Sequence, residues 1–394
     1  MYDVLILKDA TTSADELVRT MAASFTCVVQ SLPEFDGTLL GEVRSAVIYS
    51  ELRRPQDLAR ISEAIPADWR LANVVYVAPT AERVGVVQAE ASGIGRILPS
   101  HRSLDDVRAA IRDILNHDLS VRLVSFRSGI TKAVKATDTL FNGIGIAMRR
   151  RQPLRLDGLF SCSAAINEAV LGDGLATWLN AVQSHHSQTL RHVLNVAGLA
   201  ASFSNHLGLD DADRALMTEG SLLHDVGKLF IPIAVLEKPG ALSDAERALI
   251  TLHPQRGAEA LVQSGVTDPI LISAARSHHE YLDGTGYPDK LSGDAINPLV
   301  RMLTIIDIYS ALTEKRSYKE AMTPRLAIAE LAKMKTRLDQ RLLAEFRKMI
   351  LEPAFAASRS LREERARSGC ASLRIGLHPL DRGSQPTALR RMGA

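Results

Sequence analysis

The sequence predicts two folded units, an N-terminal α/β unit built on a five-stranded parallel sheet and a C-terminal all-α bundle. Residues 1–118 alternate short apolar runs with segments of helical periodicity, a pattern typical of a parallel sheet covered by helices on both faces. Residues 175–352 instead carry helical periodicity with few strand signals, interrupted by glycine and proline. A chain of 394 residues, 46% of them hydrophobic, can bury a core in each unit.

Five short runs rich in aliphatic residues are the predicted strands. They are residues 3–7, 26–30, 45–49, 73–77 and 96–98. Segments such as 14–23 and 104–115 have apolar residues at helical spacing and are expected to cover the sheet. Because helices separate the runs, the strands are joined by crossovers, which favours a parallel arrangement.

Two further segments flank the bundle. Residues 119–174 are predicted to form a helical linker, and its basic cluster at 149–151 is interpreted as solvated charge rather than a nucleic-acid patch. Residues 353–394 are rich in arginine, serine, glycine and proline, which predicts a partly disordered basic tail. The predicted order of units is therefore 1–118, 119–174, 175–352 and 353–394.

Composition excludes several classes of protein. The net charge of +2 gives no overall field that would favour nucleic acid or a membrane surface. Cys27, Cys162 and Cys370 have no paired spacing, so neither a disulfide framework nor a cysteine zinc site is expected. The first ten residues lack the pattern of a signal peptide, and no stretch of about 18 apolar residues occurs. We therefore expect a cytoplasmic protein with no membrane span and no nucleic-acid partner.

The length and strand count of the N-terminal unit resemble the receiver domain of bacterial response regulators. That family holds Mg²⁺ with an acidic cluster after the first strand and is phosphorylated on an aspartate that ends the third strand. Here Lys8 and Asp9 follow the first strand, Ser50 and Glu51 stand where the acceptor is expected, and only Thr80 matches well. The resemblance implies a degenerate receiver-like domain with no phosphoacceptor, used for dimerisation or sensing. Another small α/β domain of similar layout is the alternative.

Two motifs in the C-terminal unit carry its chemistry. The segment LLHDVGKLFIP, residues 222–232, contains the pair His224-Asp225, and HHEYLDGTGYP, residues 278–288, begins about fifty residues later. Imidazole and carboxylate ligands without a thiolate suit divalent first-row metals. Together the motifs resemble the HD-GYP family, bacterial metal-dependent phosphodiesterases that open cyclic di-GMP. The resemblance covers roughly residues 175–350.

The resemblance implies a set of metal ligands. They are His192, His224, Asp225, His253, His278, His279 and Asp307. The two oxygens of Asp225 make it the expected bridge between two metal ions. Asp307 lies in an apolar helical segment, where an unpaired charge would cost several kcal/mol. His185, seven residues before His192 and on the same helical face, is the alternative to His192. Glu168 is the local candidate for a third metal, although two metals are favoured.

The remaining motif residues are given other roles. Lys228, one turn after His224, is expected to contact a metal-bound phosphate and, with Asp225, to be catalytic. Tyr287 is expected to stack on a base or line the groove. Arg316 and Lys319 lie three residues apart and are expected to hold the far phosphate, unless they form a solvated helix end.

Three residues are expected to support the ligands indirectly. Glu280 and Asp283 are predicted to hydrogen-bond the ligating imidazoles and fix their tautomers. Ser310 stands three residues after Asp307, where the HD-GYP family usually has a second aspartate.

The resemblance also implies an activity. We expect hydrolysis of the phosphodiester bonds of cyclic di-GMP to pGpG, with further cleavage to GMP left open, through a hydroxide that bridges two divalent ions. Iron or manganese is favoured as the metal. Expected partners are cyclic di-GMP, diguanylate cyclase (GGDEF) proteins through the GYP loop, and a second copy in a homodimer. Two alternatives remain: an HD-type phosphohydrolase for another nucleotide, and a catalytically silent receptor for cyclic di-GMP.

Overall fold

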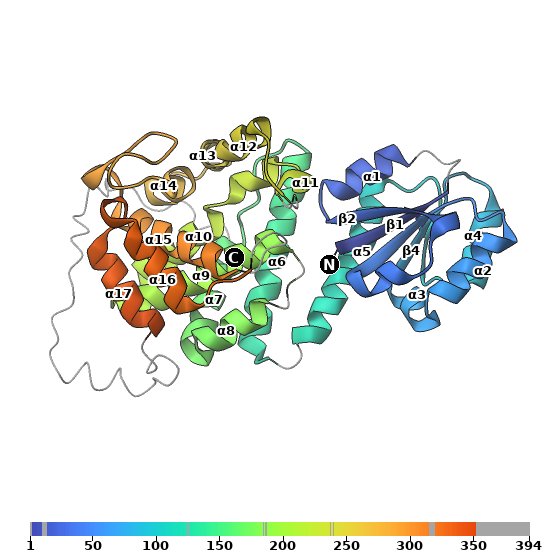
Figure 1. The fold of residues 1–394 in the computed structure, drawn as a ribbon, viewed down its shortest axis with the longest axis horizontal. Helices are drawn as coiled ribbons and strands as arrows, with labels where there is room; N and C mark the ends of the chain where they lie inside the picture. The colour runs from blue at the N-terminus through green and yellow to red at the C-terminus, as the bar shows by residue number, and fades with distance from the viewer. Residues whose placement is uncertain are drawn as a thin grey trace.

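A computed structural model of the chain has an α/β unit and a helical unit (Figure 1). It describes residues 2–9, 14–123, 126–183, 185, 187–236, 238, 240–314 and 320–351. The predicted basic tail, 353–394, lies outside the described residues, as do Arg316 and Lys319. Among the described helices, none is both long and apolar enough to cross a membrane.

The N-terminal unit contains the predicted five-stranded sheet, and all of its strands are parallel. The strands are β1 (Tyr2–Lys8), β2 (Cys27–Ser31), β3 (Val43–Tyr49), β4 (Val74–Val77) and β5 (Arg96–Leu98). Their order is β2-β1-β3-β4-β5, which is that of a doubly wound α/β fold. The prediction of fold class is therefore confirmed for this unit.

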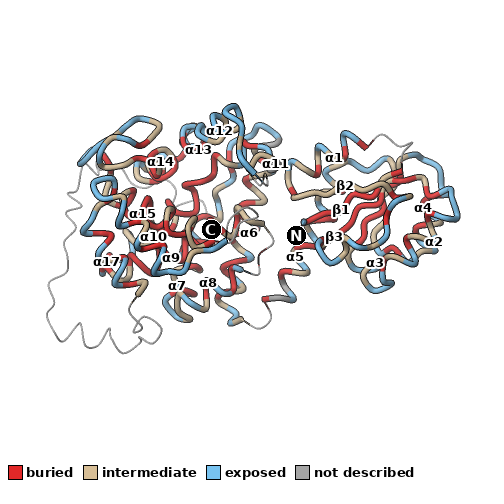
Figure 2. The backbone as a smooth tube through the Cα atoms, viewed as in Figure 1, coloured by how far each residue is buried: buried red, intermediate tan, exposed pale blue. Residues whose placement is uncertain are grey.

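Helices cover both faces of the sheet. They are α1 (Asp15–Ala22), α2 (Pro55–Ala64), α3 (Ala67–Asn73), α4 (Arg83–Ala91) and α5 (Leu104–Leu123), with short 3₁₀ helices η1 (Leu32–Glu34) and η2 (Thr38–Glu42). Successive side chains of a strand point to opposite faces. In β1, Val4 and Ile6 join the cluster under α1 and α5, while Leu5 and Leu7 join the cluster under the other helices. The central strands β1, β3 and β4 are therefore largely buried on both faces, whereas the edge strands β2 and β5 are only partly buried (Figure 2).

A hydrogen bond between Ser50 and Asp9 lies at the carboxyl end of β3, where a receiver would carry its acceptor aspartate. The Ser50 hydroxyl donates to the Asp9 carboxylate at 2.8 Å, and both residues are buried. The Tyr76 hydroxyl donates to the Ser50 carbonyl oxygen at 2.9 Å. Ser50 is thus committed to contacts within the domain. The absence of a phosphoacceptor stays a prediction, and this geometry agrees with it.

The second unit is helical over its described residues, which confirms the predicted all-α class. Its α-helices are α6 (Ser128–Arg149), α7 (Leu159–Asp173), α8 (Leu175–Val182), α9 (Gln188–His206), α10 (Asp211–Leu223), α11 (Ile233–Leu236), α12 (Asp244–Thr251), α13 (His253–Gln263), α14 (Pro269–Ser277), α15 (Pro298–Thr313), α16 (Pro324–Lys333) and α17 (Gln340–Leu351). Its 3₁₀ helices are η3 (Val226–Phe230), η4 (Gly293–Ala295) and η5 (Lys335–Arg337).

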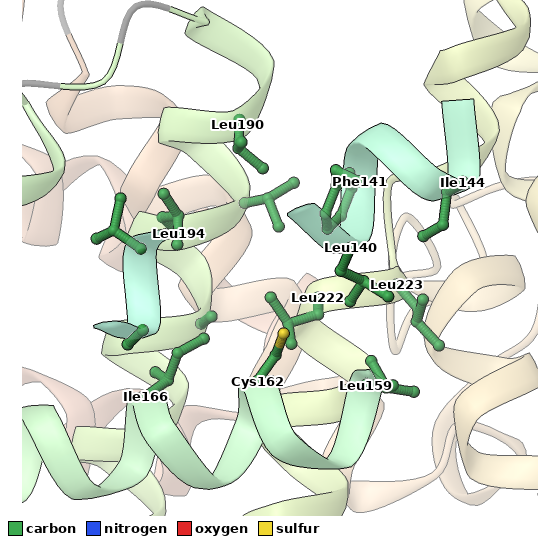
Figure 3. Close-up of a cluster of buried hydrophobic side chains, with 14 of the residues drawn as sticks. Leu140, Phe141, Ile144, Leu159, Cys162, Ile166, Leu190, Leu194, Leu222 and Leu223 are labelled. Atoms are coloured by element: carbon green, nitrogen blue, oxygen red, sulfur yellow. The ribbon is translucent and has the colours of Figure 1, made fainter. Parts of the chain in front are cut away.

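Helices α6 and α7, predicted as part of a linker, pack into the core of this bundle. Phe141 of α6 and Ile166 of α7 belong to the same buried cluster as Leu194 of α9 and Leu222 of α10 (Figure 3). A helix with an apolar face must bury that face, which explains why the segment does not stand apart as a spacer. The predicted boundary between the linker 119–174 and the bundle 175–352 stays a prediction.

Helix α9 lies at the centre of the bundle, where it packs against α7, α8, α10 and α15. Its position is fixed by Trp178 of α8, whose indole Nε1 donates to the Leu194 carbonyl oxygen at 3.0 Å. A Cβ at Gly198 would lie 2.1 Å from that nitrogen, so glycine is needed for the contact. The same helix carries His192, so this packing positions one of the predicted ligands.

We predict that Gly198→Ala lowers the free energy of unfolding by about 1–3 kcal/mol, because the fully buried Trp178 side chain must move to admit a methyl group. Thermal and urea unfolding followed by circular dichroism would measure the change. Gly172→Ala is the matched control, since a Cβ at Gly172 meets nothing within 4 Å. An equal effect of the two substitutions would contradict the prediction.

Candidate metal centre

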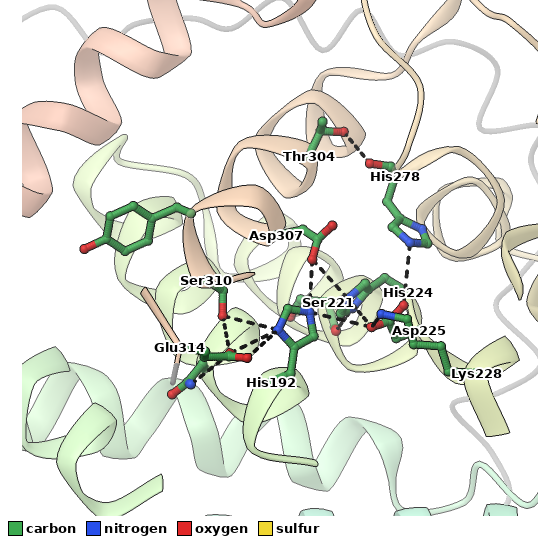
Figure 4. A network of polar contacts seen from close by, with 12 residues as sticks. His192, Ser221, His224, Asp225, Lys228, His278, Thr304, Asp307, Ser310 and Glu314 are labelled. Atoms are coloured by element: carbon green, nitrogen blue, oxygen red, sulfur yellow. Dashed lines mark hydrogen bonds and ion pairs between the residues drawn. The ribbon is translucent and has the colours of Figure 1, made fainter. Parts of the chain in front are cut away.

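Two groups of mostly buried ligand atoms lie in the helical unit, and Figure 4 shows the first group together with His278 of the second. One consists of His192, His224 and Asp307, and the other of His253, His278 and His279. Within each group, the candidate ligand atoms lie within 4.8 Å of one another. We call them the first and the second cluster. All six residues were predicted ligands from distant parts of the sequence.

The HD pair lies at a break between two helices. Helix α10 ends at Leu223, His224 is its C-terminal cap, and Asp225 precedes η3. A Cβ at Gly227 would lie 1.9 Å from the His253 carbonyl oxygen, so glycine lets η3 pack directly on the start of α13. This close packing brings His253 to Asp225.

Asp225 stands between the two clusters. Its Oδ2 atom lies 3.3 Å from His224 Nε2 and 3.6 Å from His192 Nε2, in the first cluster. Its Oδ1 atom lies 3.2 Å from His253 Nε2 and 3.7 Å from His278 Nε2, in the second cluster. One carboxylate therefore faces both clusters, which is the arrangement of a bridging ligand.

Backbone carbonyls fix the orientation of His224, His253 and His278. The Nδ1 atom of each imidazole is within hydrogen-bond distance of a carbonyl oxygen. These oxygens belong to Ser221, Ile250 and Ala274, at 2.6, 2.8 and 3.0 Å respectively. A carbonyl only accepts, so the proton sits on Nδ1, and the Nε2 lone pair is left to face Asp225.

His192 is oriented by a carboxylate that the sequence analysis missed. Its Nδ1 atom lies 3.0 Å from Glu314 Oε1, and its Nε2 atom lies 3.0 Å from Asp307 Oδ1. Glu314 also accepts hydrogen bonds from the Asn195 amide at 3.0 Å and the Ser310 hydroxyl at 2.6 Å. The spacing could have revealed Glu314, because a residue seven after Asp307 lies on the same helical face.

The residues present fit bound divalent ions. The described residues offer no hydrogen-bond partner to two buried atoms of the centre, His224 Nε2 and Asp225 Oδ1. A buried acceptor without a donor is costly, and a cation between the imidazoles and carboxylates would satisfy both atoms. A donor set of imidazole and carboxylate without thiolate is typical of divalent first-row metals.

The protonation states suit metal binding. Burial lowers the pKa of His278 well below its ordinary value, and the neighbouring imidazoles of His279 and His224 lower it further. Burial lowers the pKa of His279 to about 4. Burial raises the pKa of the Asp225 carboxyl, but Lys228 and His224 outweigh it and hold that pKa well below its ordinary value. Neutral imidazoles and an ionised carboxylate are the forms that bind a cation.

The pKa of His192 moves in the opposite direction. Burial lowers it, but the carboxylates of Glu314 and Asp307 outweigh burial and raise the pKa to about 9. Burial raises the pKa of Glu314 as well, but His192 outweighs it and brings that pKa to about 2. In the metal-free protein an imidazolium therefore lies between two carboxylates. Ligation by Nε2 must displace its proton.

Tyr287 packs on His279. The ring centroids are 4.8 Å apart and the planes are inclined by 24°. The GYP loop folds back to bring them together: the Tyr287 amide donates to the His279 carbonyl oxygen at 3.2 Å. A Cβ at Gly286 would lie 2.4 Å from Glu280 Cα, so only glycine permits this return. The predicted contact of Tyr287 with substrate stays a prediction.

The predicted roles of Glu280 and Asp283 were wrong. Glu280 accepts from the backbone amides of Asp289 and Leu291 at 2.6 and 3.1 Å, which closes the GYP loop. Asp283 accepts from the amide and hydroxyl of Thr285 at 3.0 and 2.6 Å. Both carboxylates are thus used within the loop, and backbone carbonyls orient the imidazoles instead.

The remaining predicted residues divide between the centre and the rest of the bundle. Lys228 Nζ lies 2.6 Å from Asp225 Oδ2, so it belongs to the centre. Glu168 is exposed on α7 and in neither cluster, so its position does not support a third metal. His185 is buried, with Nε2 3.3 Å from the Asp138 carboxylate, and it is also in neither cluster. This favours His192 over His185.

Comparison with known proteins gives matches to the helical unit. A family model described as an HD domain matches residues 176–342. A cyclic di-GMP phosphodiesterase of Pseudomonas aeruginosa is 34% identical over 41% of this chain and 39% of that protein. The 3′3′-cGAMP-specific phosphodiesterase 2 of Vibrio cholerae is 37% identical over 40% of this chain and 30% of that protein. The cyclic di-GMP phosphodiesterase response regulator RpfG of Xanthomonas campestris is 39% identical over 39% of this chain and 40% of that protein.

A solved structure, Bd1817, an HDG"Y"P protein from Bdellovibrio bacteriovorus, is 19% identical with a TM-score of 0.47 and covers 62% of this chain and 80% of that one. The chain spans 39%, 30% and 40% of the lengths of the three curated relatives. Residues 176–342 are similar to the HD domain family, and the Gly-Tyr-Pro segment at 286–288 lies within this match.

Proposed function

We propose that the chain hydrolyses the phosphodiester bonds of cyclic di-GMP at two divalent metal ions. The observation that carries the proposal is the position of Asp225, whose two oxygens face separate clusters of ligand atoms. The names of two relatives support the substrate, since both are cyclic di-GMP phosphodiesterases. The expected product is pGpG, with GMP as the product of a second cleavage.

The proposed ligands are the six residues of the two clusters together with Asp225. When bound, two such ions polarise the phosphoryl group and lower the pKa of a water molecule, so that hydroxide is available at neutral pH. The protein holds three of the imidazoles in one tautomer through their Nδ1 contacts, and it buries all the proposed ligands except His279. Iron and manganese are the metals that we propose, from the donor set and the HD-GYP motif.

Lys228 lies at the accessible side of the centre. Its side chain is 22% exposed, whereas that of Asp225 is 1% exposed. Next to it, Leu229 and Phe230 are 36% and 41% exposed. A cation beside an apolar surface suits a substrate that combines phosphates with flat bases. We propose that Lys228 contacts the reacting phosphate and supports the charge that develops on it.

A second candidate substrate is 3′3′-cGAMP, because a relative with 37% identity is named as specific for it. The two cyclic dinucleotides differ in one base and share the phosphodiester ring. The buried centre meets the phosphates, so it acts on either compound unless other residues exclude one base.

We predict that the purified protein, loaded with Mn²⁺ or Fe²⁺, converts cyclic di-GMP to pGpG, measured by chromatography of the nucleotides. A chelator should stop the reaction, and added metal should restore it, because ions held by imidazole and carboxylate ligands bind reversibly. Parallel reactions with 3′3′-cGAMP would rank the two substrates. Full metal loading with no turnover of either compound would favour the silent receptor.

We predict that Asp225→Asn loses both metal ions, because an amide has one oxygen and no charge with which to bridge the clusters. Metal content per chain would be measured by mass spectrometry after desalting. Asp283→Asn is the control, since that carboxylate bonds Thr285 in the GYP loop, away from the clusters. Two retained metals in Asp225→Asn would refute the bridging assignment.

We predict that Lys228→Ala keeps its metals and loses activity. Removal of a cation cannot weaken the attraction of Asp225 for metal ions, whereas loss of one charge contact to the phosphate should lower kcat by about 10²–10³. Lys238→Ala is the control, because Lys238 pairs with the Glu246 carboxylate at 2.7 Å. Normal turnover by Lys228→Ala would show that the contact is structural.

A further inference from the structure

His192 differs from the other oriented imidazoles in where it lies on its helix. His224 and His278 are the C-terminal caps of α10 and α14, and His253 follows α12. Carbonyls in the last turn of a helix have no partner within the helix, so they are free to accept the Nδ1 protons. His192 instead lies inside α9, in its second turn, where the carbonyls are used by the hydrogen bonds of the helix. Its Nδ1 proton therefore needs a side-chain acceptor.

Glu314 supplies that acceptor. Its two oxygens lie 3.0 and 3.2 Å from His192 Nδ1, and it is 7% exposed. The residue caps α15 in an extended conformation, with φ −83° and ψ 135°, which turns its side chain towards α9. From there it also accepts from Asn195, one turn along α9 from His192.

The buried C-terminal end of α15 is an energetically unfavourable position for the Glu314 carboxylate. Burial disfavours the charge, and the C-terminus of a helix carries a partial negative charge of its own. The described contacts that compensate are the His192 imidazole, the Asn195 amide and the Ser310 hydroxyl. A neutral residue at 314 would avoid the cost, so the charge is explained by what it does for His192.

Position 310, now occupied by a serine, is a second place from which a carboxylate could reach His192 Nδ1. Its hydroxyl lies 3.5 Å from His192 Nδ1 and one helical turn before Glu314, on the same face of α15. A carboxylate at either position would reach the same nitrogen. An aspartate usually stands at the position of Ser310 in the HD-GYP pattern.

We propose that Glu314 is a positioning residue of the first cluster and takes the place of a carboxylate at position 310. It holds the Nδ1 proton of His192, aims Nε2 at Asp307 and Asp225, and makes the imidazole a stronger donor to a cation. The inference rests on the proposed metal centre, but it concerns the affinity for metal and not the identity of the substrate.

The test is the affinity of the metal-free protein for Mn²⁺, measured by competition with a chromophoric chelator. Glu314→Gln should weaken binding of one ion by about 10- to 100-fold and leave the other ion nearly unaffected. The double variant Ser310→Asp/Glu314→Ser should restore the affinity to within a few-fold of the original. Glu345→Gln is the matched control. It alters another contact between a histidine and a glutamate, with His206 Nε2 3.3 Å from the Glu345 carboxylate, and neither residue is in a cluster.

Two results would overturn the proposal. The first is an unchanged Mn²⁺ affinity in Glu314→Gln. The second is a double variant that binds as weakly as Glu314→Gln while its metal-free form unfolds at the original temperature. If Glu314→Gln fails to fold, the Mn²⁺ affinity of the double variant alone tests the proposal. Restored affinity supports the proposal, and weak binding or failure to fold refutes it. Normal metal binding without turnover of any cyclic dinucleotide would refute the proposed function and leave this inference standing.

Discussion

The burial of the Asp225 carboxylate is the constraint on which the helical unit depends. The residue is 2% exposed, imidazoles face both of its oxygens, and Oδ1 has no hydrogen bond among the described residues. A buried charge of this kind costs several kcal/mol unless cations compensate it. Five segments of the bundle converge on Asp225, and glycines at 198 and 227 allow the close packing that convergence requires. The packing of the helical unit therefore creates a buried site that favours cations.

The means of orienting the ligands follows from helix geometry. Where an imidazole stands at the end of a helix, as for His224, His253 and His278, the backbone offers a carbonyl without any further residue. Where it stands inside a helix, as for His192, a second side chain must be recruited, here Glu314. The two solutions differ electrically, because a carbonyl is neutral and a carboxylate is not. The first cluster therefore carries more negative charge than the second, and the two metal positions need not have equal affinity.

The sequence predicted the features that burial imposes on its pattern, and it missed those that depend on helix ends and side-chain directions. Hydrophobic periodicity was enough for the five strands and the helical class, because burial on one or two faces imposes the pattern directly. The structure brings together the seven residues that the resemblance predicted as ligands, six in the two clusters and Asp225 between them. Glu314 was missed because the one signal for it, its spacing of seven residues from Asp307, applies only if α15 extends that far, and helix ends are poorly marked in sequence. Glu280 was misassigned because nothing in a sequence shows whether a carboxylate points at an imidazole or at a loop amide.

The centre accounts for the proposed cleavage more directly than for the choice of substrate. Its buried groups are imidazoles and carboxylates, which suit metal ions and the phosphates they would bind, and phosphates are common to every cyclic dinucleotide. Discrimination between guanine and adenine requires hydrogen bonds to base edges or a shaped contact with the rings. Leu229 and Phe230 are exposed beside Lys228, and Tyr287 covers His279 from the GYP loop. If the proposed function holds, the residues that select the base are expected on this accessible rim and not among the buried imidazoles and carboxylates.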